Sequence, residues 1–101
     1  MNEMLSHIQT AMIRINSMRH TMRNVEAVKE LATQWGVDEQ IIYAMLVLQI
    51  DGFNDVDDEI RYALQCKVDA NTLSDALVHC IADKTLQPLK MLYAEVGGGT
   101  E

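Results

Sequence analysis

The chain has 101 residues, and its 15 acidic and 8 basic side chains give a formal net charge of -7. Hydrophobic residues make up 49% and charged residues 23%, a balance that is typical of one globular domain and argues against disorder or a fibre. The acidic surplus argues against broad binding to nucleic acid or anionic membranes, and no apolar run reaches the roughly 20 residues of a membrane span.

The first predicted element is a long amphipathic helix over residues 3–23. Its apolar side chains recur at helical spacing and cover more arc than one neighbouring helix can bury. Residues 1–29 carry four basic and two acidic side chains, whereas the remaining 72 residues carry 4 basic and 13 acidic ones. We therefore predict that this basic helix binds a protein partner or a second copy of the chain, through Met4, Leu5, Ile8, Met12, Ile15, Arg19 and Met22.

Two further helices are predicted before residue 51. Asn24 is a suitable N-cap for the second helix, Gly36 suits its left-handed stop, and Asp38 can cap the next helix. The third helix, residues 39–50, is apolar nearly all round. Such a helix is stable in a water-soluble fold only if other helices bury it. We predict that it is the central helix and that at least three others shield Ile42, Met45, Leu46 and Leu48.

Three more helices are predicted after residue 54. Asp55 can cap the fourth, and Asn71 or Thr72 can cap the fifth. Because Pro88 fits only the first turn of a helix, we expect a break near Lys84 and a sixth helix from about residue 86. The predicted fold is all-α: five to six short helices in an orthogonal bundle around residues 39–50, with 1–96 as one domain and 97–101 as a disordered Gly-rich tail.

A local resemblance suggests a second function. Residues 28–47 resemble a bacterial helix-turn-helix, through Leu31, Ala32, Trp35, Gly36, Val37, Ile42 and Met45. The resemblance implies that the third helix reads DNA, with outward positions Asp38, Glu39, Gln40, Tyr43, Ala44 and Val47. These six positions hold no Arg or Lys to meet phosphates or guanine edges. Extended to residue 64, the stretch is also similar to ubiquitin-associated-type three-helix modules, which implies protein docking.

The acidic residues after the third helix do not fit a calcium loop. With Gly52 at the invariant glycine position, two ligand positions fall on Val47 and Gln49, so an acidic helix N-terminus is the simpler interpretation. On the fifth helix, His79 lies between Asp75 and Asp83 at four-residue spacing. A metal there would need a further ligand that no recognisable spacing supplies, so a solvated face is the simpler interpretation.

The two cysteines, Cys66 and Cys80, have no CxxC partner, and the chain opens without a charged-then-apolar leader, so we expect free thiols and a cytoplasmic protein. No pattern predicts a catalytic residue, a cofactor or a metal. The sequence thus predicts a small non-enzymatic interaction protein, an adaptor, an assembly or secretion chaperone, or a phage- or plasmid-type accessory factor. It would bind a protein or form a homo-oligomer, with no membrane contact. The alternative is a helix-turn-helix DNA-binding regulator.

Overall fold

The computed structural model describes the backbone of residues 3–21 and 23–98, and the side chains of residues 6–21 and 23–92. These residues form six helices and no strand, which confirms the all-α prediction: α1 (Glu3–Thr21), α2 (Val25–Trp35), α3 (Glu39–Ile50), α4 (Val56–Gln65), α5 (Ala70–Asp83) and α6 (Gln87–Gly98). None of these helices is long and apolar enough to cross a membrane.

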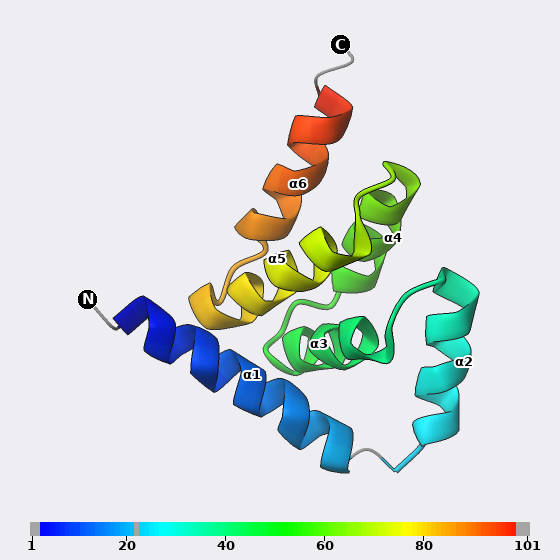
Figure 1. Ribbon diagram of the computed structural model, residues 1–101, viewed down its shortest axis with the longest axis vertical. Helices are drawn as coiled ribbons and strands as arrows, with labels where there is room; N and C mark the ends of the chain where they lie inside the picture. The colour runs from blue at the N-terminus through cyan, green and yellow to red at the C-terminus, as the bar shows by residue number, and fades with distance from the viewer. Residues whose placement is uncertain (1–2, 22, 99–101) are drawn as a thin grey trace.

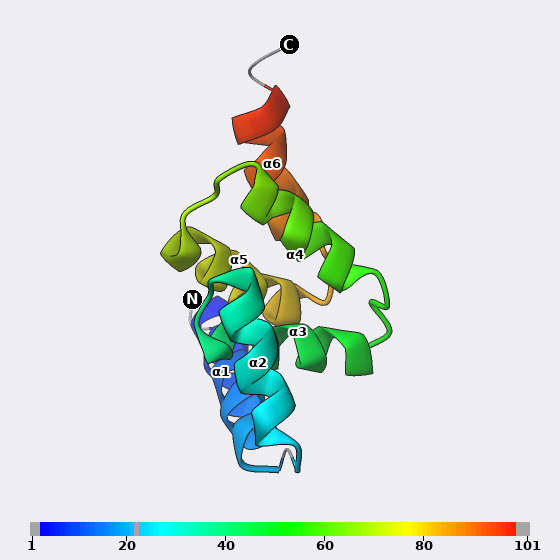
Figure 2. The same cartoon turned by 90° about the vertical axis from the view of Figure 1, so that its right-hand side faces the viewer.

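Two helices share the centre of the bundle. Helix α3 packs against α1, α2, α4 and α5, as predicted for a central helix, and α5 packs against α1, α3 and α6. Helix α1 runs along one edge, with all the other helices on one side of it (Figure 1), and α4 crosses α6 at the opposite end (Figure 2). The Cα envelope measures 43 × 39 × 22 Å. Because α1 lies at one edge of the bundle, one side of it faces away from the other helices (Figure 1).

The core confirms most of the predicted central positions. Ile42, Met45 and Leu48 on α3 are buried, and Leu48 is fully enclosed. Leu46 was also predicted to be nearly free of solvent, and this prediction is wrong: its side chain is only half-buried. It lies at the edge of the contact between α1 and α3, where it shares a shallow apolar surface with Met18 and Ile50.

The start of α2 and α3 follows from local side-chain chemistry. The side chain of Asn24 accepts a hydrogen bond of 3.1 Å from the backbone nitrogen of Ala27, and that of Asp38 accepts one of 2.9 Å from Gln40. Gly36 ends α2 with a φ of 69°, a left-handed conformation in which a side chain would be strained. These three predictions are confirmed.

Two predicted caps are corrected. Helix α5 is capped by Asp69, whose carboxylate accepts hydrogen bonds from the backbone nitrogens of Asn71 (3.0 Å) and Thr72 (3.3 Å). The expected caps Asn71 and Thr72 therefore lie inside the first turn. Their backbone nitrogens are the donors that the Asp69 carboxylate caps. Asp55 does precede α4, but its side chain makes no capping hydrogen bond.

The predicted break before α6 is confirmed. Helix α5 ends at Asp83 and is followed by its C-cap Lys84, a left-handed residue with a φ of 56°, and Pro88 falls in the first turn of α6. The hydroxyl of Thr85 accepts a hydrogen bond of 3.2 Å from the backbone nitrogen of Gln87. The helix continues to Gly98, into the segment expected as a tail, and residues 99–101 lie outside the described residues.

Candidate interaction surface

The structure separates the residues that were predicted to contact a partner. Met12 and Arg19 are exposed, Ile8 is half-buried against the core, and Ile15 is only 2% exposed. Ile15 therefore offers no surface to a partner, because the chain's own core already covers it. The side chains of the remaining three, Met4, Leu5 and Met22, lie outside the described residues.

The exposed side of α1 has an apolar residue at its centre that the sequence analysis did not select. Ile13 is 65% exposed, and polar residues surround it at positions three, four and seven away. Together they form what we call the outer strip of α1: Ser6, Gln9, Thr10, Ile13, Asn16, Ser17 and His20, all of which are exposed. Ile13 was missed because it lies on the side of the helix opposite the apolar stripe.

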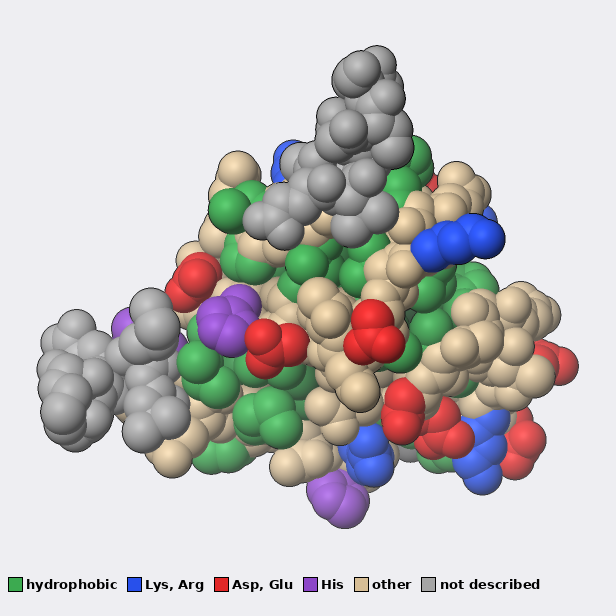
Figure 3. Space-filling model, turned by 45° about the horizontal axis from the view of Figure 1, so that its top comes forward, with side chains coloured by type: hydrophobic (Ala, Val, Ile, Leu, Met, Phe, Trp, Pro, Cys, Tyr) green, Lys and Arg blue, Asp and Glu red, His purple; other side chains and the backbone are tan. Residues whose placement is uncertain are grey.

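The outer strip carries no formal charge when histidine is neutral. Exposed faces of other helices differ: α2 presents Glu26, Lys29 and Glu30, and α4 presents Asp58 and Arg61. In Figure 3, acidic and basic side chains lie side by side on the right of the molecule, where α2 is placed. Depletion of charge around an exposed apolar side chain is typical of an interface core.

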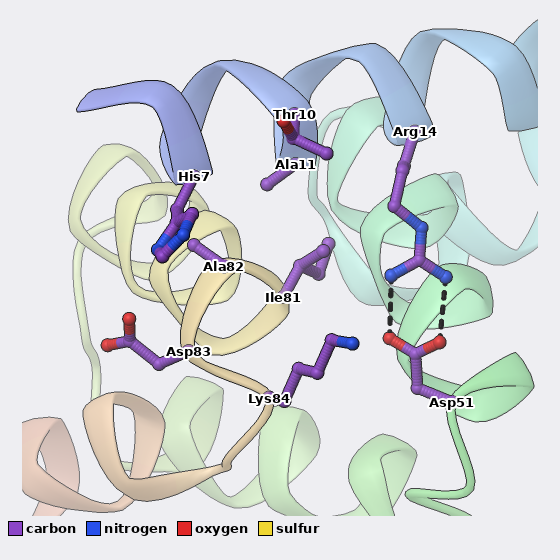
Figure 4. Close-up of a pocket in the computed structure, with 9 residues that line it drawn as sticks. All are labelled: His7, Thr10, Ala11, Arg14, Asp51, Ile81, Ala82, Asp83 and Lys84. Atoms are coloured by element: carbon purple, nitrogen blue, oxygen red, sulfur yellow. Dashed lines mark hydrogen bonds and ion pairs between the residues drawn. The ribbon is translucent and has the colours of Figure 1, made fainter. Parts of the chain in front are cut away.

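A cleft of about 620 Å³ borders this surface. The start of α1 forms one wall, with His7, Thr10, Ala11 and Arg14, and the ends of α3 and α5 form the other, with Asp51, Ile81, Ala82, Asp83 and Lys84. Figure 4 shows His7 reaching down from α1 toward Ala82 and Asp83, and Lys84 extending toward Arg14 and Asp51.

The strongest polar contact in the cleft joins α1 to the end of α3. The guanidinium of Arg14 donates hydrogen bonds of 2.8 and 2.7 Å to the two carboxylate oxygens of Asp51. These hydrogen bonds hold the pKa of Asp51 below its usual value of 3.8, and the nearby charges of Arg14 and Lys84 act in the same direction. The pair links α1 to the end of α3 and gives Arg14 a carboxylate partner within the chain.

The second arginine of α1 is also engaged by the chain's own body. The guanidinium of Arg19 lies over the ring of Tyr43, 5.3 Å from the centroid, and Tyr43 is itself buried. Arg14 is therefore paired with a carboxylate, whereas Arg19 keeps its positive charge and lies over a buried ring; neither residue belongs to the outer strip.

The remaining candidate groups are placed as follows. Burial raises the pKa of the Cys80 thiol to about 11, which disfavours the nucleophilic thiolate. His79 contacts the backbone carbonyl oxygen of Asp75 through Nδ1, at 2.9 Å. Within the described residues, no three or more His, Cys, Asp or Glu side chains gather as metal ligands.

Three of the six positions that the helix-turn-helix resemblance implies for DNA contact are buried. Tyr43, Ala44 and Val47 are at most 2% exposed, because α1, α2, α4 and α5 pack around α3. No family model, curated protein or solved structure matches the chain.

Proposed function

We propose that the protein is a small non-enzymatic interaction module that binds a protein chain through the outer strip of α1. The observation that carries the proposal is Ile13, an exposed large apolar side chain at the centre of an uncharged helix face. Met12, at 39% exposure, extends this apolar surface toward the core side of the helix.

The composition of the surface supports a protein partner. Between residues 4 and 18 the chain has one formally charged residue, Arg14, and that residue is paired with Asp51. A surface that binds a nucleic-acid duplex or an anionic membrane carries clustered free cations. A surface that binds a protein has a charge-depleted centre with Met and Arg near it. The outer strip has the second composition.

The setting that we propose is cytoplasmic. The thiols of Cys66 and Cys80 are free, as expected in a reducing compartment. An adaptor, an assembly or secretion chaperone, and a phage- or plasmid-type accessory factor all fit such a module, because each works by docking rather than by chemistry.

The proposal is tested by placing a photo-reactive benzophenone amino acid at Ile13 in the full chain, and at Met91 as a matched position. Met91 lies on α6 and is 54% exposed, so both probes face solvent at similar exposure. Irradiation in cells that express the chain should give a discrete adduct from position 13, identified by mass spectrometry, and little from position 91. Equal adducts from both positions, or none from position 13, would contradict the proposed function.

A further inference from the structure

We infer that Asp51 is the site at which this chain forms isoaspartate spontaneously, and that its ion pair with Arg14 slows the reaction in the folded protein. In this reaction the backbone nitrogen of Gly52 attacks the side-chain carboxyl carbon of Asp51, and a cyclic succinimide forms with loss of water. Water then opens the ring at either carbonyl. The product is aspartate again or isoaspartate, in which the main chain runs through the former side chain. The inference does not depend on the outer strip of α1 and goes beyond the proposed function.

The sequence makes Asp51 the most reactive of the chain's aspartates. Of all its aspartates and asparagines, Asp51 alone is followed by glycine. Glycine has no side chain to shield its backbone nitrogen, so attack on the preceding carboxyl group meets the least hindrance. Gly52 is exposed, has a φ of 104°, and a Cβ added to it would meet no atom within 4 Å. The turn is therefore open to the water that hydrolyses the ring.

The ion pair restrains the carboxyl group of Asp51. The guanidinium of Arg14 donates to both carboxylate oxygens, through hydrogen bonds of 2.8 and 2.7 Å. Figure 4 shows the carboxylate pointing toward Arg14 on α1. Ring formation expels one of these two oxygens as water, so at least that oxygen must first leave the guanidinium. The two-pronged contact therefore opposes the reaction in the folded chain.

The attacking nitrogen is restrained as well. The backbone nitrogen of Gly52 donates a hydrogen bond of 3.0 Å to the carbonyl oxygen of Gln49, and that of Phe53 donates one of 3.0 Å to Leu48. These bonds continue the last turn of α3, in which Asp51 has a ψ of -1°. The Gly52 nitrogen must give up its bond to Gln49 before it attacks, so the reaction needs a local opening of this turn.

The protonation state of the carboxyl group acts in the same direction. A neutral carboxyl group is attacked more readily than a carboxylate, because it can release its oxygen as water. The hydrogen bonds from Arg14 hold the pKa of Asp51 below its usual value of 3.8, and the charges of Arg14 and Lys84 add to this effect. At a given pH, Asp51 is therefore neutral less often than an aspartate without a cationic partner.

Isoaspartate at residue 51 would remove the contact that protects it. The rearrangement adds a methylene group to the main chain and leaves a carboxyl group attached directly to the α-carbon. This shorter group would no longer reach the guanidinium of Arg14 in the present geometry, so α1 would lose its ion pair with the end of α3. The modified chain should therefore be less stable than the unmodified one.

The test follows isoaspartate at residue 51 in the full chain, incubated for several weeks at physiological pH and temperature. The proteins are wild type, Arg14→Gln, and Asp69→Ala, which loses the cap of α5 without changing the ion pair. Peptide mass spectrometry with electron-transfer fragmentation distinguishes isoaspartate from aspartate at each position. Arg14→Gln should accumulate isoaspartate at residue 51 several-fold faster than wild type, and Asp69→Ala should accumulate it at the wild-type rate.

Two controls separate the ion pair from general stability. Circular dichroism checks that each variant is folded. Arg14→Lys keeps the positive charge but cannot form the two-pronged contact, so its rate should lie between those of wild type and Arg14→Gln. In concentrated urea, wild type and Arg14→Gln should form isoaspartate at residue 51 at one common rate. This rate should exceed that of the folded wild type and that of every other aspartate in the unfolded chain.

Three outcomes would overturn the inference. Equal rates for wild type and Arg14→Gln in buffer would show that the ion pair does not protect Asp51. A rate for Asp69→Ala as high as that for Arg14→Gln would show that overall stability, and not the pair, controls the reaction. A rate at residue 51 in urea no higher than at the other aspartates would show that Asp51 is not the preferred site.

Discussion

Arg14 on α1 and Asp51 at the end of α3 form a two-pronged ion pair across 37 residues of sequence, with both nitrogen–oxygen distances between 2.7 and 2.8 Å. The pair is partly shielded from water, because the side chain of Asp51 is only 19% exposed. It ties the helix that carries the outer strip to the central helix. A double-mutant cycle with Arg14→Gln and Asp51→Asn should give a coupling free energy of about 1 kcal/mol, measured by urea unfolding.

The same pair predicts a pH dependence. The pKa of Asp51 is lowered in the folded state, so its contribution to the free energy of unfolding is complete above its ordinary pKa of 3.8 and disappears as the pH falls through the lowered value. The stability difference between wild type and Asp51→Asn should therefore be constant from pH 7 down to about 5 and shrink below about 4. A difference that grew on acidification would contradict this assignment.

Two leucines of α3 should respond differently to truncation. Leu48→Ala opens a cavity in a fully buried site and should lower the free energy of unfolding by about 2–5 kcal/mol. Leu46→Ala removes a half-buried side chain at the edge of the bundle and should lower it by about 1 kcal/mol. Chemical denaturation of the two variants measures the difference, and equal losses would show that Leu46 is as enclosed as Leu48.

The caps of α4 and α5 provide another matched pair. Asp69→Ala removes two hydrogen bonds to backbone nitrogens and should lower the free energy of unfolding by about 1 kcal/mol. Asp55→Ala removes a side chain that makes no capping bond and should change it by only a few tenths of a kcal/mol. Thermal and urea unfolding measure both losses of stability. If Asp55→Ala destabilised the protein more than Asp69→Ala, the assigned caps would be wrong.

The fold could be predicted from the sequence where the signal is local. The caps Asn24 and Asp38, the stop at Gly36 and the break before Pro88 depend on residues within a few positions of each other. The nearly continuous apolar composition of residues 39–50 also placed α3 at the centre, since a helix that is apolar all round must be enclosed by others.

What could not be predicted depends on contacts between helices. The half-buried position of Leu46 and the pairing of Arg14 with Asp51 are decided by how α1 crosses α3, which no local pattern encodes. Ile15 was predicted to contact a partner, but the other helices of the chain bury it. How much of α1 these helices cover depends on how they pack, which the sequence of α1 does not show. Ile13 was overlooked because hydrophobic periodicity selects the stripe that packs inward, whereas Ile13 lies on the other side of the helix.

The most direct test of the outer strip uses the protein that the Ile13 photo-adduct identifies, added unlabelled to the ¹⁵N-labelled full chain and followed by amide ¹⁵N–¹H NMR spectra. We predict that the amide signals of Gln9, Ile13, Asn16, Ser17 and His20 shift or broaden as the partner is added, and that those of α2 and α4 do not change. In Ile13→Lys these changes should be strongly reduced at the same concentrations. Changes centred on α4 or α6, or no change in α1, would contradict the claim that the outer strip of α1 binds a protein.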